Sequence, residues 1–139
     1  MSTDQAAAGA AIDNVAALRA GYAAYANGDI PTVLALLDRD VEWVGAAGSP
    51  YAGTYRGPQA VLDGVFRRIG AEWAGFAVEA EEFIGTGDAI AVVLTYRGTY
   101  RATGRSMQAR AVHVWHFRAG KAIRFEQVAD TAVVNSALG

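Results

Sequence analysis

The sequence contains no cysteine, which excludes disulfides, thiolate nucleophiles and cysteine-based metal sites together. It has no run of Lys or Arg, and its 12 basic and 14 acidic residues give a formal net charge of -2, so nothing indicates binding to a nucleic-acid backbone. No apolar run approaches the ~20 residues that a membrane span needs, and the N-terminus lacks the basic opening of a signal peptide. These absences predict a cytoplasmic protein that binds neither nucleic acid nor membrane.

Length and composition predict one globular domain. The chain has 139 residues, of which 53% are hydrophobic and 19% charged, and a disordered chain would contain far fewer apolar residues. We predict a single domain over residues 1–139, in which residues 1–10 form a flexible leader.

The segment from Ala109 to Val128 is typical of two strands joined by a tight turn, because β-branched and aromatic residues alternate on either side of Gly120. Strand side chains point to opposite faces with a period of two. We therefore expect one face to carry Ala109, Ala111, His113, Trp115 and Phe117, and on the second strand Ile123, Phe125, Gln127 and Ala129. A mostly apolar face with a few polar groups is what a small-molecule pocket needs.

Periodicity and capping residues predict the remaining elements. Helical spacing indicates a helix from about Ile12 to Asn27-Gly28, a short helix capped by Asp29, and a third helix that starts at Gly57-Pro58. Strands are expected over 40–44, 76–84 and 89–100, a Gly-rich loop over 46–57, and a last helical turn capped by Asp130. Helices followed by a run of strands indicate an α+β domain.

This order of elements resembles the nuclear-transport-factor-two-like superfamily over nearly the whole chain. The segments YAAYANGDIPTVLALLDRDVEW, YRGPQAV, HVWHFRAGKAIRF and QVADTA resemble its SnoaL-like and ketosteroid-isomerase-related members. The resemblance implies a cone-shaped α+β barrel, in which a curved antiparallel sheet wraps around N-terminal helices. It does not decide the function, because the superfamily hosts isomerases, cyclases, hydratases, epoxide hydrolases and binding proteins on one scaffold.

The catalytic residues of these relatives are missing at the matching positions. Ketosteroid isomerase uses an Asp base, a Tyr and a protonated Asp, and these fall at Gly45, Gly21 and Trp115. Tyr22 is a poor substitute for Gly21, because one helical step turns the side chain by ~100°. Steroid isomerisation by that mechanism is therefore disfavoured. The acid/base Asp of the SnoaL-type cyclases falls at Gln127.

The limonene-type epoxide hydrolase mechanism is disfavoured as well. It needs an Asp-Arg-Asp set on inward positions, and Arg110 falls on the outward face of its strand.

His113 and Gln127 are the catalytic candidates that remain. His113 is the one inward group on the hairpin that can exchange a proton near neutral pH, and Gln127 can hold a carbonyl or water by hydrogen bonds. The alternative is that His113 is a core residue whose ring is satisfied by a neighbour. His113 and His116 lie on opposite faces of one strand and cannot share a metal ion, so no metal is predicted.

Aromatic side chains are expected to line the pocket or, alternatively, simply to fill the core. Two of them, Tyr51 and Tyr55, lie on the Gly-rich loop and are expected either to cover the pocket mouth or to pack on the surface. The predicted ligand-binding set is Tyr25, Trp43, Tyr51, Tyr55, Phe66, Trp115 and Phe125.

Two functional hypotheses follow. The first is an isomerase, cyclase or lyase that needs no cofactor and performs acid–base chemistry on a small hydrophobic carbonyl compound. The second is a protein of the same fold that binds a small hydrophobic or aromatic ligand without transforming it. In both, outward valines at 112, 114 and 128 predict a homodimer through the outer face of the sheet, where Arg and Glu side chains are available to pair across the axis.

Overall fold

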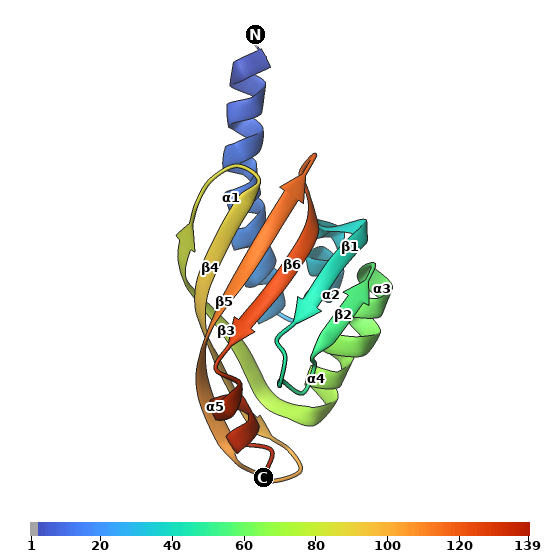
Figure 1. Cartoon of the computed structure of the whole chain (residues 1–139), viewed down its shortest axis with the longest axis vertical. Coiled ribbons are helices and arrows are strands. Elements are labelled where there is room, and N and C mark those ends of the chain that lie inside the picture. The colour runs from blue at the N-terminus through green and yellow to red at the C-terminus, as the bar shows by residue number, and fades with distance from the viewer. Residues whose placement is uncertain (1–2) are drawn as a thin grey trace.

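The protein folds as a six-stranded curved sheet with helices on its concave side, as a computed structural model shows (Figure 1). The structure describes the backbone of residues 3–139 and the side chains of residues 14–139. The predicted leader, residues 1–10, lies outside the residues whose side chains are described, and it stays a prediction. None of the described helices is long and apolar enough to cross a membrane.

The helices and strands follow the predicted order. The helical elements are α1 (Thr3–Ala26), α2 (Ile30–Leu36), α3 (Pro58–Val61), the π-helix η1 (Leu62–Phe66), α4 (Arg67–Glu72) and α5 (Thr131–Ser136). The strands are β1 (Leu37–Gly45), β2 (Gly53–Arg56), β3 (Trp73–Ile84), β4 (Ala89–Tyr100), β5 (Ser106–Arg118) and β6 (Lys121–Ala129). Both predicted caps are confirmed: Asp29 accepts from the Thr32 amide and Asp130 from the Val133 amide.

The sheet has the strand order β2-β1-β6-β5-β4-β3. Neighbours pair antiparallel except β1 and β6, which run parallel. The prediction of an antiparallel sheet is corrected at this pairing. In sequence α2 and β1 precede the hairpin β5–β6, and β1 pairs with β6 at the edge of that hairpin. The sheet is therefore mixed.

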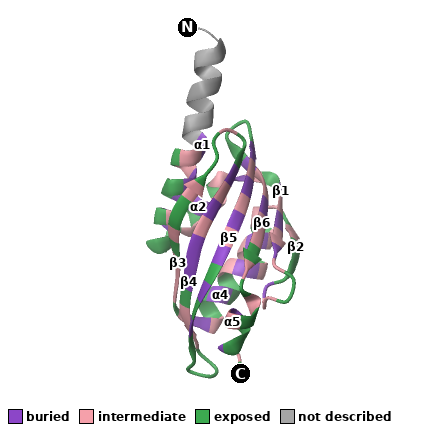
Figure 2. Ribbon diagram, turned by 60° about the vertical axis from the view of Figure 1, so that its left-hand side comes forward, coloured by how far each residue is buried: buried purple, intermediate pink, exposed green. Residues whose placement is uncertain are grey.

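Burial confirms the predicted alternation in the β5–β6 hairpin. On β5, every second residue from Met107 to Phe117 is buried (Figure 2). The turn places both Ala119 and Gly120 at positive φ, which twists the two strands in the sense that a hairpin requires. Ile123 does not share the face of Phe125 as predicted, because a bulge after His116 pairs Phe117 with Ala122 and leaves Ile123 only partly buried.

Two features of the chain between β1 and β3 differ from the prediction. The Gly-rich loop contains a strand, β2, which pairs with β1 and sets Tyr55 opposite Trp43. The third helix is interrupted by η1, where Gly64 lies against the ring of Tyr55 so closely that a Cβ would be 2.4 Å from Tyr55 Cε1. A glycine at this point lets the helix approach β2.

Candidate functional site

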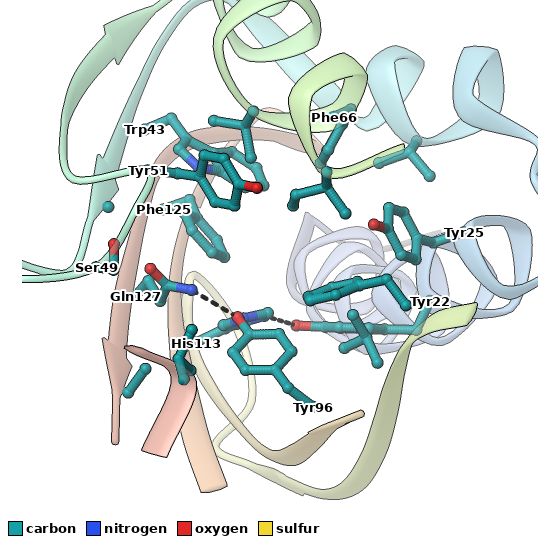
Figure 3. A pocket seen from close by; sticks show the side chains of 18 of the residues that line it. Tyr22, Tyr25, Trp43, Ser49, Tyr51, Phe66, Tyr96, His113, Phe125 and Gln127 are labelled. Atoms are coloured by element: carbon teal, nitrogen blue, oxygen red, sulfur yellow. Dashed lines mark hydrogen bonds between the residues drawn. The ribbon is translucent and has the colours of Figure 1, made fainter. Parts of the chain in front are cut away.

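A cavity lies between the concave face of the sheet and the helices, with a free volume of about 100 Å³. An apolar cavity of roughly 150 Å³ is known to take one benzene molecule, so this space is somewhat smaller than that and its walls must shift slightly to admit a single ring. Its walls come from α1, α2, η1, α4 and the inward faces of the strands (Figure 3).

The structure brings most of the predicted site residues together around this cavity. Those that line it are Tyr25, Trp43, Tyr51, Phe66, His113, Trp115, Phe125 and Gln127. Tyr55 is the exception: its ring packs on Gly64, and its hydroxyl donates to the carbonyls of Tyr51 and Ala52. Tyr55 thus lies apart from the other predicted residues, because the pairing of β2 with β1 sets its ring against Gly64 of η1.

Aromatic rings form one wall of the cavity. The rings of Trp43 and Phe125 stack with centroids 3.6 Å apart. Trp115 and Phe66 meet the ring of Trp43 edge-on at 5.9 and 5.5 Å. Such a wall favours a flat apolar ligand, since aromatic pairs add specific edge and face contacts to the burial of area.

His113 lies at the centre of a hydrogen-bonded chain in this wall. Its Nδ1 is 2.6 Å from the Tyr22 hydroxyl, and its Nε2 is 2.5 Å from the Tyr96 hydroxyl (Figure 3). The Trp115 indole N–H donates to Tyr22 Oη at 3.0 Å, and the Gln127 amide donates to Tyr96 Oη at 2.9 Å. Both ring nitrogens of His113 are therefore occupied by phenol groups.

Burial holds these groups in their uncharged forms. It lowers the pKa of His113 from 6.5 to about 3, because the imidazolium loses its hydration in the core. It raises the pKa of both Tyr22 and Tyr96 well above 10 for the same reason. His113 is thus a neutral hydrogen-bonding group near pH 7, rather than a base with a pKa near 7.

Gln127 is held in one orientation. The residue faces His113 across the β5–β6 pair, and its Oε1 accepts from the Ala46 amide at 3.0 Å. Because the oxygen must face that backbone N–H, the Gln127 nitrogen must face Tyr96. The side chain therefore orients Tyr96 in the cavity wall.

Tyr51 closes the cavity on the side of α4. Its hydroxyl donates to Glu72 Oε1 at 2.7 Å and accepts from the Trp73 indole at 3.0 Å. The Arg68 guanidinium lies 4.7 Å from the centre of the Tyr51 ring. These contacts hold the loop before β2 against α4, and the role predicted for Tyr51 at the pocket mouth stays a prediction.

Three polar groups of the site were not predicted from the sequence. Tyr96 belongs to the buried face of β4 with Ile90, Val92 and Leu94, and the alternation of that strand could have marked it. Tyr22 lies on the face of α1 that helical spacing marks with Leu18 and Tyr25, but the spacing did not show that its hydroxyl reaches His113. Ser49 lines the cavity, and its buried hydroxyl has no hydrogen-bond partner.

No Asp, Glu, Lys or Arg is found among the described residues that line the cavity, so its wall carries no charged side chain. Within residues 14–139 there is also no group of three His, Asp or Glu side chains placed to hold a metal ion. Gly45 lines the cavity at the position where the resemblance placed a catalytic Asp, and a Cβ there would lie 2.2 Å from the Tyr51 carbonyl oxygen. The fold therefore leaves no room for a carboxylate at this position.

Comparison with families of known proteins matches residues 18–125, more than half of the chain, to the SnoaL-like domain. The chain belongs to the SnoaL-like domain family. None of the curated proteins matches this SnoaL-like protein.

Solved structures confirm the nuclear-transport-factor-two-like fold of this SnoaL-like protein. It is similar to an NTF2-like protein from Burkholderia thailandensis (38% identity, 91% of this chain and 97% of that chain, TM-score 0.88). It is also similar to an NTF2-like protein of unknown function from Burkholderia pseudomallei (37%, 89% and 95%, TM-score 0.82). A third similar structure is TerC co-crystallized with polyporic acid (30%, 90% and 97%, TM-score 0.81).

Proposed function

We propose that this SnoaL-like protein binds a small, largely apolar compound that carries a carbonyl oxygen, and that it acts on this compound without a cofactor. The observation that carries the proposal is an aromatic cavity whose polar groups are uncharged and gathered around His113. Apolar walls desolvate such a compound, and a few fixed hydrogen-bond donors orient it.

The chemistry available in this cavity is polarisation of the bound carbonyl. A hydrogen bond from a buried hydroxyl stabilises the negative charge that develops on a carbonyl oxygen when the compound isomerises, cyclises or eliminates. The low pKa of His113 makes it a poor general base, and the raised pKa values of Tyr22 and Tyr96 keep them as neutral hydrogen-bond donors, so the predicted proton transfer would rely on the substrate's own groups. These neutral hydrogen-bond donors support an isomerase, cyclase or lyase that activates its substrate by polarising the carbonyl oxygen.

A protein that only binds the ligand is the second candidate. It is favoured by the same neutral lining: the familiar acid/base carboxylates have no counterpart among the described lining residues, and both nitrogens of His113 are engaged. Turnover of a bound compound separates the two candidates.

The test is a binding screen followed by a turnover assay. The panel contains polyporic acid, chosen because TerC was co-crystallized with it, and three single-ring compounds: acetophenone, ethylbenzene and benzoate. Backbone amide shifts of the labelled protein in NMR titrations report binding and its location. We expect acetophenone to perturb the cavity residues and to bind more tightly than ethylbenzene by about three- to tenfold, the value of one neutral hydrogen bond.

A matched pair of variants shows whether binding occurs in the cavity. Val65→Trp fills the cavity from η1, and Leu62→Trp places the same side chain one turn away, on a residue that does not line the cavity. Binding by the Leu62 variant but not by the Val65 variant is expected. A panel that leaves the cavity residues unperturbed, or ligands that bind the Val65 variant equally well, would refute the proposed site.

A further inference from the structure

His113, Tyr22 and Tyr96 together carry one hydrogen more than the two hydrogen bonds between them can use. Both phenol oxygens already accept one hydrogen bond, Tyr22 from the Trp115 indole and Tyr96 from the Gln127 amide. An indole N–H can only donate, and the Ala46 amide fixes which end of Gln127 faces Tyr96. The direction of these two outer hydrogen bonds is therefore settled.

The two inner hydrogen bonds share three hydrogens. A neutral imidazole has one N–H and one lone pair, so one tyrosine donates to His113 while the other accepts from it. The two phenols and the ring supply three hydrogens for two contacts, Tyr22 to Nδ1 and Tyr96 to Nε2. If Nε2 carries the hydrogen, the Tyr96 hydroxyl hydrogen is left over; if Nδ1 carries it, the Tyr22 hydrogen is left over.

We propose that His113 is a positioning residue whose tautomer decides whether Tyr96 or Tyr22 offers its hydroxyl hydrogen to an uncharged, oxygen-bearing ligand in the cavity. The count of hydrogens is a property of the free protein, whereas the identity of the acceptor rests on the function proposed above. In either tautomer one buried donor lacks a partner in the network, and an oxygen of the ligand supplies it. Leaving such a donor unpaired in an apolar cavity is unfavourable, so the ligand's oxygen is expected to select one tautomer.

Two observations narrow the ligand to an uncharged compound. No cationic side chain is found among the described residues lining the cavity, so a carboxylate would be buried without a counter-charge. The Ser49 hydroxyl is buried in the same wall without a partner, so it offers a second polar contact. In the view of Figure 3, Ser49 and Gln127 lie on the same side of the cavity. A compound with a carbonyl and a second oxygen suits this set better than a hydrocarbon or an acid.

The first test reads the tautomer of His113 in the free protein. The chain has two histidines, so long-range nitrogen–proton NMR spectra of the labelled protein show two imidazoles, and His116→Asn assigns them. Tyr96→Phe leaves Tyr22 as the sole partner of His113, and the ring hydrogen is expected on Nδ1. Tyr22→Phe leaves Tyr96 as the sole partner, and the ring hydrogen is expected on Nε2. In each variant two hydrogens remain for one contact, so one stays unpaired: a hydroxyl hydrogen can rotate toward the cavity, whereas a ring N–H fixed against the new phenylalanine cannot, so the ring N–H is expected to take the contact.

Opposite tautomers in the two variants would confirm the arrangement. The same tautomer in both, or a charged His113 ring near pH 7, would overturn it whether or not any ligand has been found. This result is independent of the binding screen, because it needs no ligand.

The second test uses the preference for acetophenone over ethylbenzene. Each single variant still holds two hydrogens for one contact, so each retains one free hydroxyl and should keep the preference within about threefold. The double variant Tyr22→Phe, Tyr96→Phe retains none and should lose it. If either single variant abolishes the preference, that tyrosine alone contacts the ligand and the switching role of His113 is wrong. If the two single variants show opposite tautomers but no compound of the panel binds, that result counts against the proposed function alone.

Discussion

At the scale of single residues, the neutrality of His113 makes stability depend on pH. Burial lowers the pKa of the folded His113 to about 3, while the unfolded chain binds the proton with the ordinary value of 6.5. As the pH falls below 6.5, the unfolded state gains a proton that the folded state does not bind. This contribution to stability is complete above about pH 6.5 and is lost as the pH falls toward 3.

We expect the free energy of unfolding to drop by roughly 2–3 kcal/mol between about pH 6.5 and 4.5 through this residue, at about 1.4 kcal/mol per pH unit. Urea unfolding at a series of pH values measures it. His113→Gln removes the titrating group and should flatten this part of the profile, and His116→Gln controls for the loss of an imidazole from the same strand. An unchanged slope in His113→Gln would show that the ring is not buried as the structure has it.

At the scale of elements, alternation within the two strands of the β5–β6 hairpin was enough to place their inward residues. The inward positions of His113, Trp115 and Phe125 follow from a period of two, which is a local property of the chain. Their hydrogen-bond partners could not be derived in this way. The contact between His113 and Tyr96 depends on the register of β4 against β5, and the contact with Tyr22 depends on how α1 rotates against the sheet.

The elements that the sequence did not reveal are held by contacts between distant segments. β2 has only four residues in a Gly-rich stretch and exists by pairing with β1, and η1 accommodates the ring of Tyr55. The parallel pairing of β1 with β6 likewise joins parts of the chain that are far apart in sequence. No local pattern encodes these features, so propensity and periodicity could not find them.

The end of β1 is predicted to be intolerant of any side chain at Gly45. A Cβ there would lie 2.2 Å from the carbonyl oxygen of Tyr51, a backbone atom that cannot rotate away. Gly45→Ala should therefore cost about 1–3 kcal/mol, the usual range for overpacking, and should loosen the loop that Tyr51 anchors. Gly70→Ala is the matched control: it lies within α4 with open space around it, and it should stabilise by about 0.5–1 kcal/mol. Denaturant unfolding of the two variants decides; a Gly45→Ala protein as stable as the parent would contradict this account.

At the scale of the whole molecule, the two faces of the sheet are unequally covered. Figure 1 looks onto the sheet with α1 and α2 behind it, and no described helix covers the front of β4, β5 and β6. On that outer face Val112 and Val114 are half-buried, and Val128 is 54% exposed. The charged groups beside them pair within the chain, since Arg124 contacts Glu42 and Glu126 at 3.2 and 3.1 Å. The charge of Arg124 is therefore already compensated within the chain.

We propose that a second copy of the chain covers this outer face, because a sheet with one face on water should alternate cleanly between apolar and polar residues, and this one does not. Light scattering at low micromolar concentration should give the mass of a dimer. Val128→Glu places an unpaired carboxylate within the proposed contact and should shift the mass to that of a monomer, since removing a like charge from water on both subunits is costly. Ala20→Glu puts the same charge on an exposed position of α1, behind the sheet, and should leave the dimer intact. A parent protein that scatters as a monomer would leave the valines shielded only by the stems of the neighbouring arginines and would refute the dimer.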